Sequence, residues 1–206
     1  MAGLSWGEGI QSREEQRERK RMTILRTAAQ TINEVGFRQM SLDKLATKLN
    51  VTKPTLYYYV KNKDDILSSI LEVAMTQLRQ EIQTVSETNL SGLGKLHHFM
   101  QRYAVVMGDD FGACLITSRI SAFASGFKEQ YHEASREVLT AVRTLISEGI
   151  QDGSIAECDP KYVSSALLGT MNETVYWNFI GGKEKPELAF IQFWKFFEKG
   201  LRTNVI

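Results

Sequence analysis

Apolar residues recur three and four positions apart along most of the chain, which is the spacing of one face of an α-helix. The first such run is formed by Ile24, Leu25, Ala28, Ala29, Ile32 and Val35. Gly36 follows where a left-handed residue would end a helix. The chain has only three prolines, and few of its segments alternate as strands do. The pattern predicts an all-α protein.

Residues 41–60 have the pattern of a short helix, a turn and a second short helix. Ser41 is a candidate N-cap for the first of these helices and Thr52 for the second, with Pro54 in the first turn after it. Asn50 stands in the turn between them and tolerates left-handed backbone. Together with the helix before them, these two segments predict a three-helix head that contains a helix-turn-helix.

A longer helix is expected from a cap at Asn62 through Ile82. Breaks at 91–94, 108–112, 125–126, 153–160 and 181–186 separate the helical segments that follow it. Those segments lie near 95–107, 113–124, 128–151, 161–180 and 187–203. Their lengths are typical of an antiparallel helical bundle. The chain is therefore predicted to have about nine helices, with a larger bundle joined to the small head.

The last two segments carry more apolar residues than one helix stripe can hold. A terminal helix that is apolar on two faces needs a second covering surface. We expect a partner subunit to supply that surface in a four-helix packing, although burial of both helices within one chain is the alternative. The candidate dimer-interface residues are Leu167, Met171, Phe190, Trp194 and Phe197.

The net charge of +1 conceals an uneven distribution. Residues 1–63 hold 12 Lys and Arg against 6 Asp and Glu, a balance of +6. Residues 64–206 hold 13 against 18, a balance of −5. A basic head on an acidic body indicates that the head meets a polyanion, unless the asymmetry is accidental.

The N-terminal region mixes basic residues with glutamates. We expect residues 1–18 to form a flexible basic extension that enters a DNA minor groove, or else a helical extension with internal ion pairs. Residues 19–79 are expected to form one domain and residues 80–206 a second, larger one.

Several classes of protein are disfavoured by the composition. No apolar run is long enough to cross a membrane, and no secretory signal is visible, so a cytoplasmic location is expected. Cys114 and Cys158 match neither a metal spacing nor a disulfide framework. The sequence offers no nucleophile–base pair and no glycine-rich phosphate loop, so neither an enzyme, a metal nor a cofactor is expected.

The second helix of the helix-turn-helix carries residues suited to DNA. Lys53 can donate to guanine, and Pro54 can pack on a thymine methyl group. Tyr57 is expected to face the groove, while Tyr58 and Tyr59 point toward the flanking phosphates. Phosphate contacts are also open to Lys61 and Lys63.

Residues 19–79 resemble the N-terminal DNA-binding domain of the TetR family of transcriptional regulators. The resemblance rests on Gly36-Phe37, Leu45-Ala46 and Thr55-Leu56-Tyr57, among other matches. It implies base contacts from Lys53, Pro54 and Tyr57, and phosphate contacts from Thr55, Tyr58, Tyr59 and Lys63. Ser41, Thr52 and Lys61 complete the candidate set. Asn50 departs from the glycine, and Val60 from the phenylalanine, that many members carry.

Residues 80–206 resemble the helical regulatory domain of the same family, which implies that they form a ligand-binding and dimerisation domain. That resemblance implies a homodimer on a palindromic operator and a repressor released by an apolar or acyl-CoA-like effector. Mixed aromatic and methionine residues suit an adaptable apolar pocket, although each is equally compatible with an ordinary core. The candidate ligand residues are Phe99, Met100, Tyr103, Met107, Phe111, Arg119, Phe123, Met171 and Trp177. The alternative function is a helical enzyme or lipid carrier with a non-functional helix-turn-helix.

Overall fold

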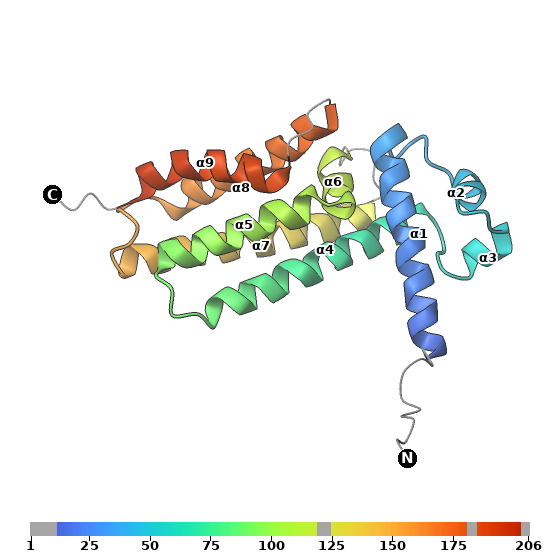
Figure 1. The fold of residues 1–206 in the computed structure, drawn as a ribbon, viewed down its shortest axis with the longest axis horizontal. Coiled ribbons are helices and arrows are strands. Elements are labelled where there is room, and N and C mark those ends of the chain that lie inside the picture. The colour runs from blue at the N-terminus through green and yellow to red at the C-terminus, as the bar shows by residue number, and fades with distance from the viewer. Residues whose placement is uncertain (1–11, 119–124, 181–184, 203–206) are drawn as a thin grey trace, which may run out of the picture.

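The computed structural model describes residues 12–118, 125–180 and 185–202. In those ranges the helices are α1 (Arg13–Val35), α2 (Leu42–Lys48), α3 (Lys53–Tyr57), α4 (Lys63–Ser86), α5 (Gly92–Gly108), α6 (Asp110–Thr117), α7 (Ser125–Gln151), α8 (Pro160–Ile180) and α9 (Pro186–Leu201). One isolated antiparallel bridge joins Ile155 to Arg202. The prediction of an all-α chain with about nine helices is confirmed for the described residues. Figure 1 shows a small head at one end of an elongated helical bundle.

Helix α1 begins earlier than expected. Ser12 and Glu15 form a capping box, in which the Ser12 hydroxyl accepts from the Glu15 N–H at 3.1 Å and the Glu15 carboxylate accepts from the Ser12 N–H at 3.0 Å. The expected flexible extension through residue 18 is therefore wrong for residues 13–18, which follow the helical alternative. The remainder of the expected extension, residues 1–11, lies outside the described ranges.

The predicted caps of the head are in place. Ser41, Thr52 and Asn62 each accept a hydrogen bond from the backbone N–H three residues later, at the starts of α2, α3 and α4. Asn50 has a φ of 53°, so it adopts the left-handed conformation that the turn requires. These local signals fix the helix-turn-helix before any long-range packing is considered.

A single helix, α4, runs from the head into the body (Figure 1). It packs on α1 near its start and on α5, α6 and α7 further along. At the head end, Arg21 of α1 donates to the Ser69 hydroxyl of α4 at 2.8 Å. Because buried residues recur along α4 from Ile66 to Val85, one continuous apolar core joins the head to the body.

Helix α5 lies within the body and packs on α4, α6, α7, α8 and α9. The break expected at 108–112 is shorter than the sequence indicated, because only Asp109 separates α5 from α6. Gly112 lies inside α6, where a Cβ atom would collide with the backbone of Met107. The expected break at 125–126 is also wrong, since α7 begins at Ser125. The helix expected at 113–124 ends at Thr117, and residues 119–124 lie outside the described ranges.

Candidate nucleic-acid interface and effector pocket

The helix expected to enter the major groove is short and exposed. It spans Lys53–Tyr57, and its cap Thr52 accepts from the Thr55 N–H at 3.3 Å while the two threonine hydroxyls lie 2.8 Å apart. Leu56 is 1% exposed and anchors α3 on the head core, whereas the other side chains of α3 face solvent. The buried leucine therefore directs the polar face of the helix outward, where a groove can receive it.

Lys53 is held by α2. Its ammonium donates to the Asp43 carboxylate at 2.7 Å, and this hydrogen bond raises the pKa of Lys53. Both side chains are 61% exposed, so water competes with the pair and it holds the lysine only weakly. The Lys53 ammonium can therefore leave Asp43 at little cost.

The three tyrosines have three different surroundings. Tyr57 is 52% exposed and Tyr58 is 65% exposed. Tyr59 is half-buried against the head core, and its ring meets that of Tyr58 edge-on with centroids 5.0 Å apart. Because α3 ends at Tyr57, Tyr58 and Tyr59 lie in the following turn, where the Tyr59 N–H donates to the Leu56 carbonyl at 2.9 Å. Two tyrosine rings are thus exposed, while the third supports the fold.

Lys63 has a structural task in the free protein. Its ammonium donates to the Phe37 carbonyl at 2.6 Å and lies 4.5 Å from the centre of the Phe37 ring. Burial lowers the pKa of Lys63. The lysine thereby ties the loop between α1 and α2 to the start of α4. Lys61 is exposed, and the Ser41 hydroxyl is occupied in capping α2.

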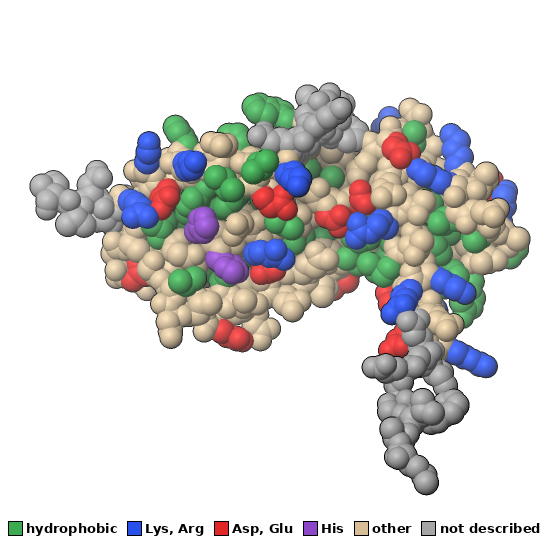
Figure 2. Space-filling model, in the orientation of Figure 1, with side chains coloured by type: hydrophobic (Ala, Val, Ile, Leu, Met, Phe, Trp, Pro, Cys, Tyr) green, Lys and Arg blue, Asp and Glu red, His purple; other side chains and the backbone are tan. Residues whose placement is uncertain are grey.

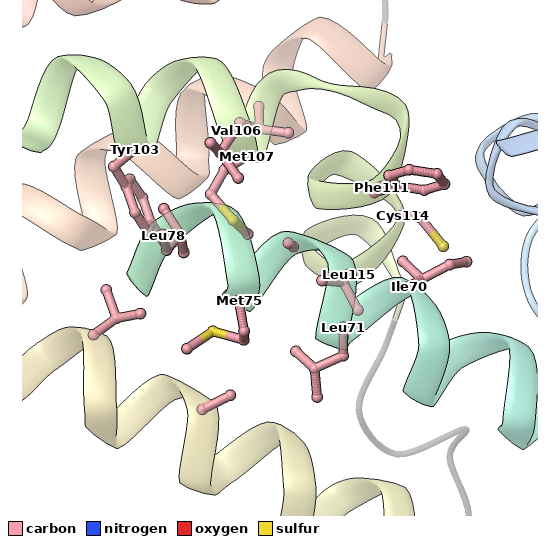
Figure 3. Packing of buried hydrophobic residues seen from close by; sticks show 14 of the residues in the cluster. Ile70, Leu71, Met75, Leu78, Tyr103, Val106, Met107, Phe111, Cys114 and Leu115 are labelled. Atoms are coloured by element: carbon pink, nitrogen blue, oxygen red, sulfur yellow. The ribbon is translucent and has the colours of Figure 1, made fainter. Parts of the chain in front are cut away.

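An apolar cavity of about 100 Å³ lies in the body. Its lining comes from α4, α5, α6, α7 and α8, and consists of Leu71, Ala74, Met75, Leu78, Tyr103, Met107, Leu115, Tyr131, Ala134, Ser135, Val138, Leu168 and Asn172. Figure 3 shows Met75 and Leu71 of α4 near Leu115 of α6, with Tyr103 and Met107 of α5 on the neighbouring side. The cavity therefore lies where the helix from the head passes between the helices of the body.

A few polar groups line this apolar space. The Tyr103 hydroxyl donates to the Asn172 side-chain oxygen at 2.7 Å. Burial raises the pKa values of Tyr103 and Tyr131, so both hydroxyls stay neutral. An effector would meet uncharged hydrogen-bonding groups at these positions.

The candidate ligand residues divide into four groups. Tyr103 and Met107 line the cavity. Phe99, Met100, Phe111 and Met171 are buried in the core but are absent from the cavity lining. Trp177 is 56% exposed, and Arg119 and Phe123 lie outside the described residues. The lining that sequence reasoning missed comes mainly from α4 and α7, whose apolar stripes look the same whether they pack on a helix or on a cavity.

Helix α6 contacts both the cavity and the head. Leu115 of α6 lines the cavity. At the start of α6, Arg26 of α1 donates to Asp109 at 2.9 Å and to Asp110 at 3.2 Å, and its guanidinium lies 4.8 Å from the Phe111 ring centre. Asp109 contributes most to the raised pKa of Arg26. Helix α6 thus connects the cavity lining directly to α1.

The residues expected to form the dimer interface are mostly covered by their own chain. Leu167, Met171, Phe190 and Trp194 are each at most 5% exposed, and Phe197 is half-buried. The Trp194 ring packs at 4.9 Å from His97 of α5. A side chain buried in its own subunit offers no surface to a partner, so the expectation is wrong for the first four residues. Among the side chains of α8 and α9 whose burial is described, the large apolar ones that are exposed are Tyr162, Tyr176, Trp177, Leu188, Ile191 and Phe196.

Two kinds of feature are absent from the described residues. No group of three or more histidine, cysteine or carboxylate side chains there is arranged to hold a metal ion. No helix in that part of the chain is both long enough and apolar enough to span a membrane.

Two family models match the chain and together cover the head and the body. The model for bacterial regulatory proteins of the tetR family matches residues 24–78. The model for the tetracyclin repressor-like C-terminal domain matches residues 89–201, more than half of the chain. The chain belongs to the TetR family. The resemblance stated for residues 19–79 is therefore confirmed, and the bundle that follows them belongs to the same family.

Relatives of this TetR-family chain include regulators of lipid metabolism. It is 26% identical to the fatty acid metabolism regulator protein of Bacillus subtilis over 162 residues, which is 78% of this chain and 84% of the relative. A FadR structure from Bacillus subtilis with stearoyl-CoA has a TM-score of 0.71 at 24% identity, covering 87% of this chain and 98% of that one. AibR with isovaleryl coenzyme A and operator DNA has a TM-score of 0.72 at 18% identity, covering 84% and 95%. These structural likenesses establish the fold.

Proposed function

We propose that this TetR-family chain is a ligand-responsive repressor that binds a palindromic operator as a homodimer. An effector with an apolar or acyl chain releases it from DNA. The observation that carries this proposal is an exposed recognition helix in the head together with an apolar cavity in the body, whose walls include α4 and α6, two helices that contact α1 of the head. Residues 19–79 supply the DNA-binding domain and residues 80–206 the effector and dimer domain, acting in the cytoplasm.

The DNA contacts come from the exposed surface of α3 and the turn after it. Lys53 and Tyr57 read base edges, with Pro54 beside them, because these side chains are exposed while Leu56 is buried in the head core. Tyr58 and Lys61 contact phosphates, with Thr55. Ser41, Thr52, Tyr59 and Lys63 belong to the same surface but hold the head together through their caps, packing and carbonyl contacts.

The effector is an acyl chain or a similarly apolar group. The cavity lining supports this, because it is aliphatic and aromatic, with Tyr103, Asn172 and Ser135 as neutral polar groups. AibR and FadR, which share the fold, bind isovaleryl-CoA and stearoyl-CoA. The thioester's bulky headgroup would lie outside the apolar space that receives its chain.

The small size of the cavity couples effector binding to the position of the heads. Pockets for drug-sized ligands measure about 300–1,000 Å³, whereas this cavity measures about 100 Å³. Because the surrounding core is close-packed, a larger effector must separate α4 from α7 or shift α6. Both α4 and α6 contact α1 of the head. The effector therefore changes the spacing of two heads that must fit half-sites about one helical turn apart.

The dimer forms through the exposed face of α8 and α9. Among the side chains whose burial is described, six large apolar ones on these two helices face solvent in the single chain, among them Trp177 and Phe196. Exposed apolar surface marks an interaction site when it forms a large patch. Pairing α8 and α9 with their copies buries this face and makes a four-helix interface.

The proposal is tested with DNA selected in vitro from a random-sequence library by the full chain. We expect a palindromic duplex to be enriched, and stearoyl-CoA or isovaleryl-CoA to lower the affinity for it while coenzyme A alone does not. Ala134→Phe places a ring in the cavity and should keep DNA affinity while abolishing release. Fluorescence anisotropy of the labelled duplex measures both quantities.

Two tyrosine variants test the division of roles on α3. Tyr57→Phe should weaken the selected duplex more than a random one, because a base contact is lost. Tyr58→Phe should weaken both duplexes equally, because a phosphate contact carries no sequence information. Failure to enrich any duplex would refute the repressor, and acyl-CoA binding without any change in DNA affinity would favour a lipid carrier.

A further inference from the structure

The first two turns of α1 and the tyrosines after α3 enclose a groove with a volume of about 390 Å³. It is lined by Arg13, Glu14, Gln16, Arg17, Lys20, Tyr58 and Tyr59. Three cations face one carboxylate there, so the groove has a formal charge of +2. Figure 2 shows Lys and Arg side chains along the lower part of α1, at the edge of the head. The groove lies outside the surface expected from the helix-turn-helix alone.

The spacing of these cations places them on one side of the helix. At about 100° per residue, positions 13, 17 and 20 fall within an arc of about 60°. Of the nearby glutamates, Glu14 lines the groove, whereas Glu15 accepts from Ser12 in the capping box and Glu18 pairs with Arg21 at 3.6 Å. Cations therefore outnumber carboxylates on the side of the helix that lines the groove, in a segment whose sequence is a mixture of both.

The groove is continuous with the surface of the recognition helix. The Arg17 guanidinium lies 5.4 Å from the centre of the Tyr58 ring, within the range of a cation–π contact. Tyr58 follows directly after α3, whose polar face points outward. An arginine held over an aromatic ring keeps its planar donors in a fixed orientation, which suits two-point contact with phosphate oxygens.

We propose that the first two turns of α1 form a second phosphate-binding surface, which grips the DNA backbone beside the half-site read by α3. Arg13, Arg17 and Lys20 donate to successive phosphates of one strand, and Tyr58 lies at the junction between this groove and the recognition helix. The inference rests on the proposed DNA-binding function and extends it beyond the helix-turn-helix.

The groove's chemistry favours the DNA backbone over base edges. All three cations are exposed and sit on a rigid helix beside the head. Phosphate contacts fix the position of a protein on DNA but read no sequence. The helix therefore contributes affinity and register, while α3 retains the task of discriminating between sequences.

The test compares two triple variants of the full chain. Arg13→Gln, Arg17→Gln and Lys20→Gln remove the cations of the groove, and glutamine keeps the helix propensity. The matched control, Arg136→Gln, Lys161→Gln and Lys185→Gln, removes three exposed cations of the body. Each phosphate contact contributes about 0.9 to the magnitude of the slope of log affinity against log salt concentration. Loss of three contacts should therefore reduce the magnitude of this slope by about 2.7 per protomer.

The measurement is made on the in vitro selected duplex and on a random duplex of equal length. We expect the groove variant to lose affinity equally on both, with a shallower salt dependence than the control. A salt slope equal to that of the control would overturn the inference, and so would a loss confined to the selected duplex, which would indicate base reading. If the unmodified chain selects no duplex at all, the proposed function itself fails, and the two failures are thereby distinguished.

Discussion

Arg26→Gln removes the cation that joins the head to the start of α6. The guanidinium contacts Asp109 at 2.9 Å and Asp110 at 3.2 Å, and lies 4.8 Å from the centre of the Phe111 ring. The Arg26 side chain is 46% exposed, so its ion pairs are screened by solvent and contribute about 0.2–1 kcal/mol. A cation–π contact at an exposed site adds about 0.5–1 kcal/mol. We therefore expect the free energy of unfolding to fall by about 1 kcal/mol.

Arg79→Gln is the matched control. The Arg79 side chain has the same 46% exposure and contacts Glu137 at 2.8 Å and Glu72 at 3.2 Å. Its contacts join α4 to α7 inside the body and do not reach the head. We expect its loss to lower the free energy of unfolding by about 0.5 kcal/mol. Urea unfolding of both variants establishes whether these costs are comparable before any DNA is added.

The decisive quantity is the ratio of DNA affinities without and with saturating stearoyl-CoA. This ratio reports the coupling between the two sites and is independent of how tightly the effector binds once the protein is saturated. If α6 transmits the effector's shift through Arg26, loss of about 1 kcal/mol of that contact reduces the ratio about fivefold. Arg79→Gln should leave the ratio at the wild-type value. An unchanged ratio in Arg26→Gln, with stability lowered as expected, would refute transmission through this contact.

Two further predictions concern the head and the dimer. Lys63→Met removes the ammonium donor from the Phe37 carbonyl. It should lower the free energy of unfolding by about 2 kcal/mol and leave the salt dependence of DNA binding unchanged. Lys61→Met should instead reduce the magnitude of the salt slope by about 0.9 and leave the free energy of unfolding unchanged. A reduced salt slope with unchanged stability for Lys63→Met would instead show that Lys63 contacts phosphate. Trp177→Glu with Phe196→Glu should give a monomer in sedimentation, because both side chains are exposed on α8 and α9, while Leu90→Glu, which alters an exposed leucine elsewhere, should remain a dimer.

The head could be predicted closely because its signals are local. Ser41, Thr52 and Asn62 cap their helices through contacts three residues away, and Asn50 adopts the left-handed turn for reasons of its own backbone. Such features depend on neighbouring residues and are visible in sequence. The start of α1 was the local feature of the head that was predicted wrongly. Its capping box at Ser12 lies in a segment that was interpreted from its charge alone.

The effector cavity could be predicted only in part. Tyr103 and Met107 were identified, but most of the other lining residues come from α4 and α7, and the rest come from α6 and α8. An apolar side chain that faces a cavity and one that faces another side chain belong to the same helical stripe. Only the arrangement of the helices in space distinguishes these two kinds of side chain, and that arrangement cannot be inferred from the residue types.

For α8 and α9 too, the sequence alone does not show which apolar side chains face which neighbour. Their aromatic residues exceed one stripe, which indicates two covering surfaces. One cover is α5, whose His97 contacts Phe190 and Trp194, so these rings face inward. The other cover must then meet the rings that face away from α5, and Phe196, at 76% exposed, is the clearest of them. The sequence thus predicts that two covers are needed, while the packing on α5 decides which aromatic residues remain for a second subunit.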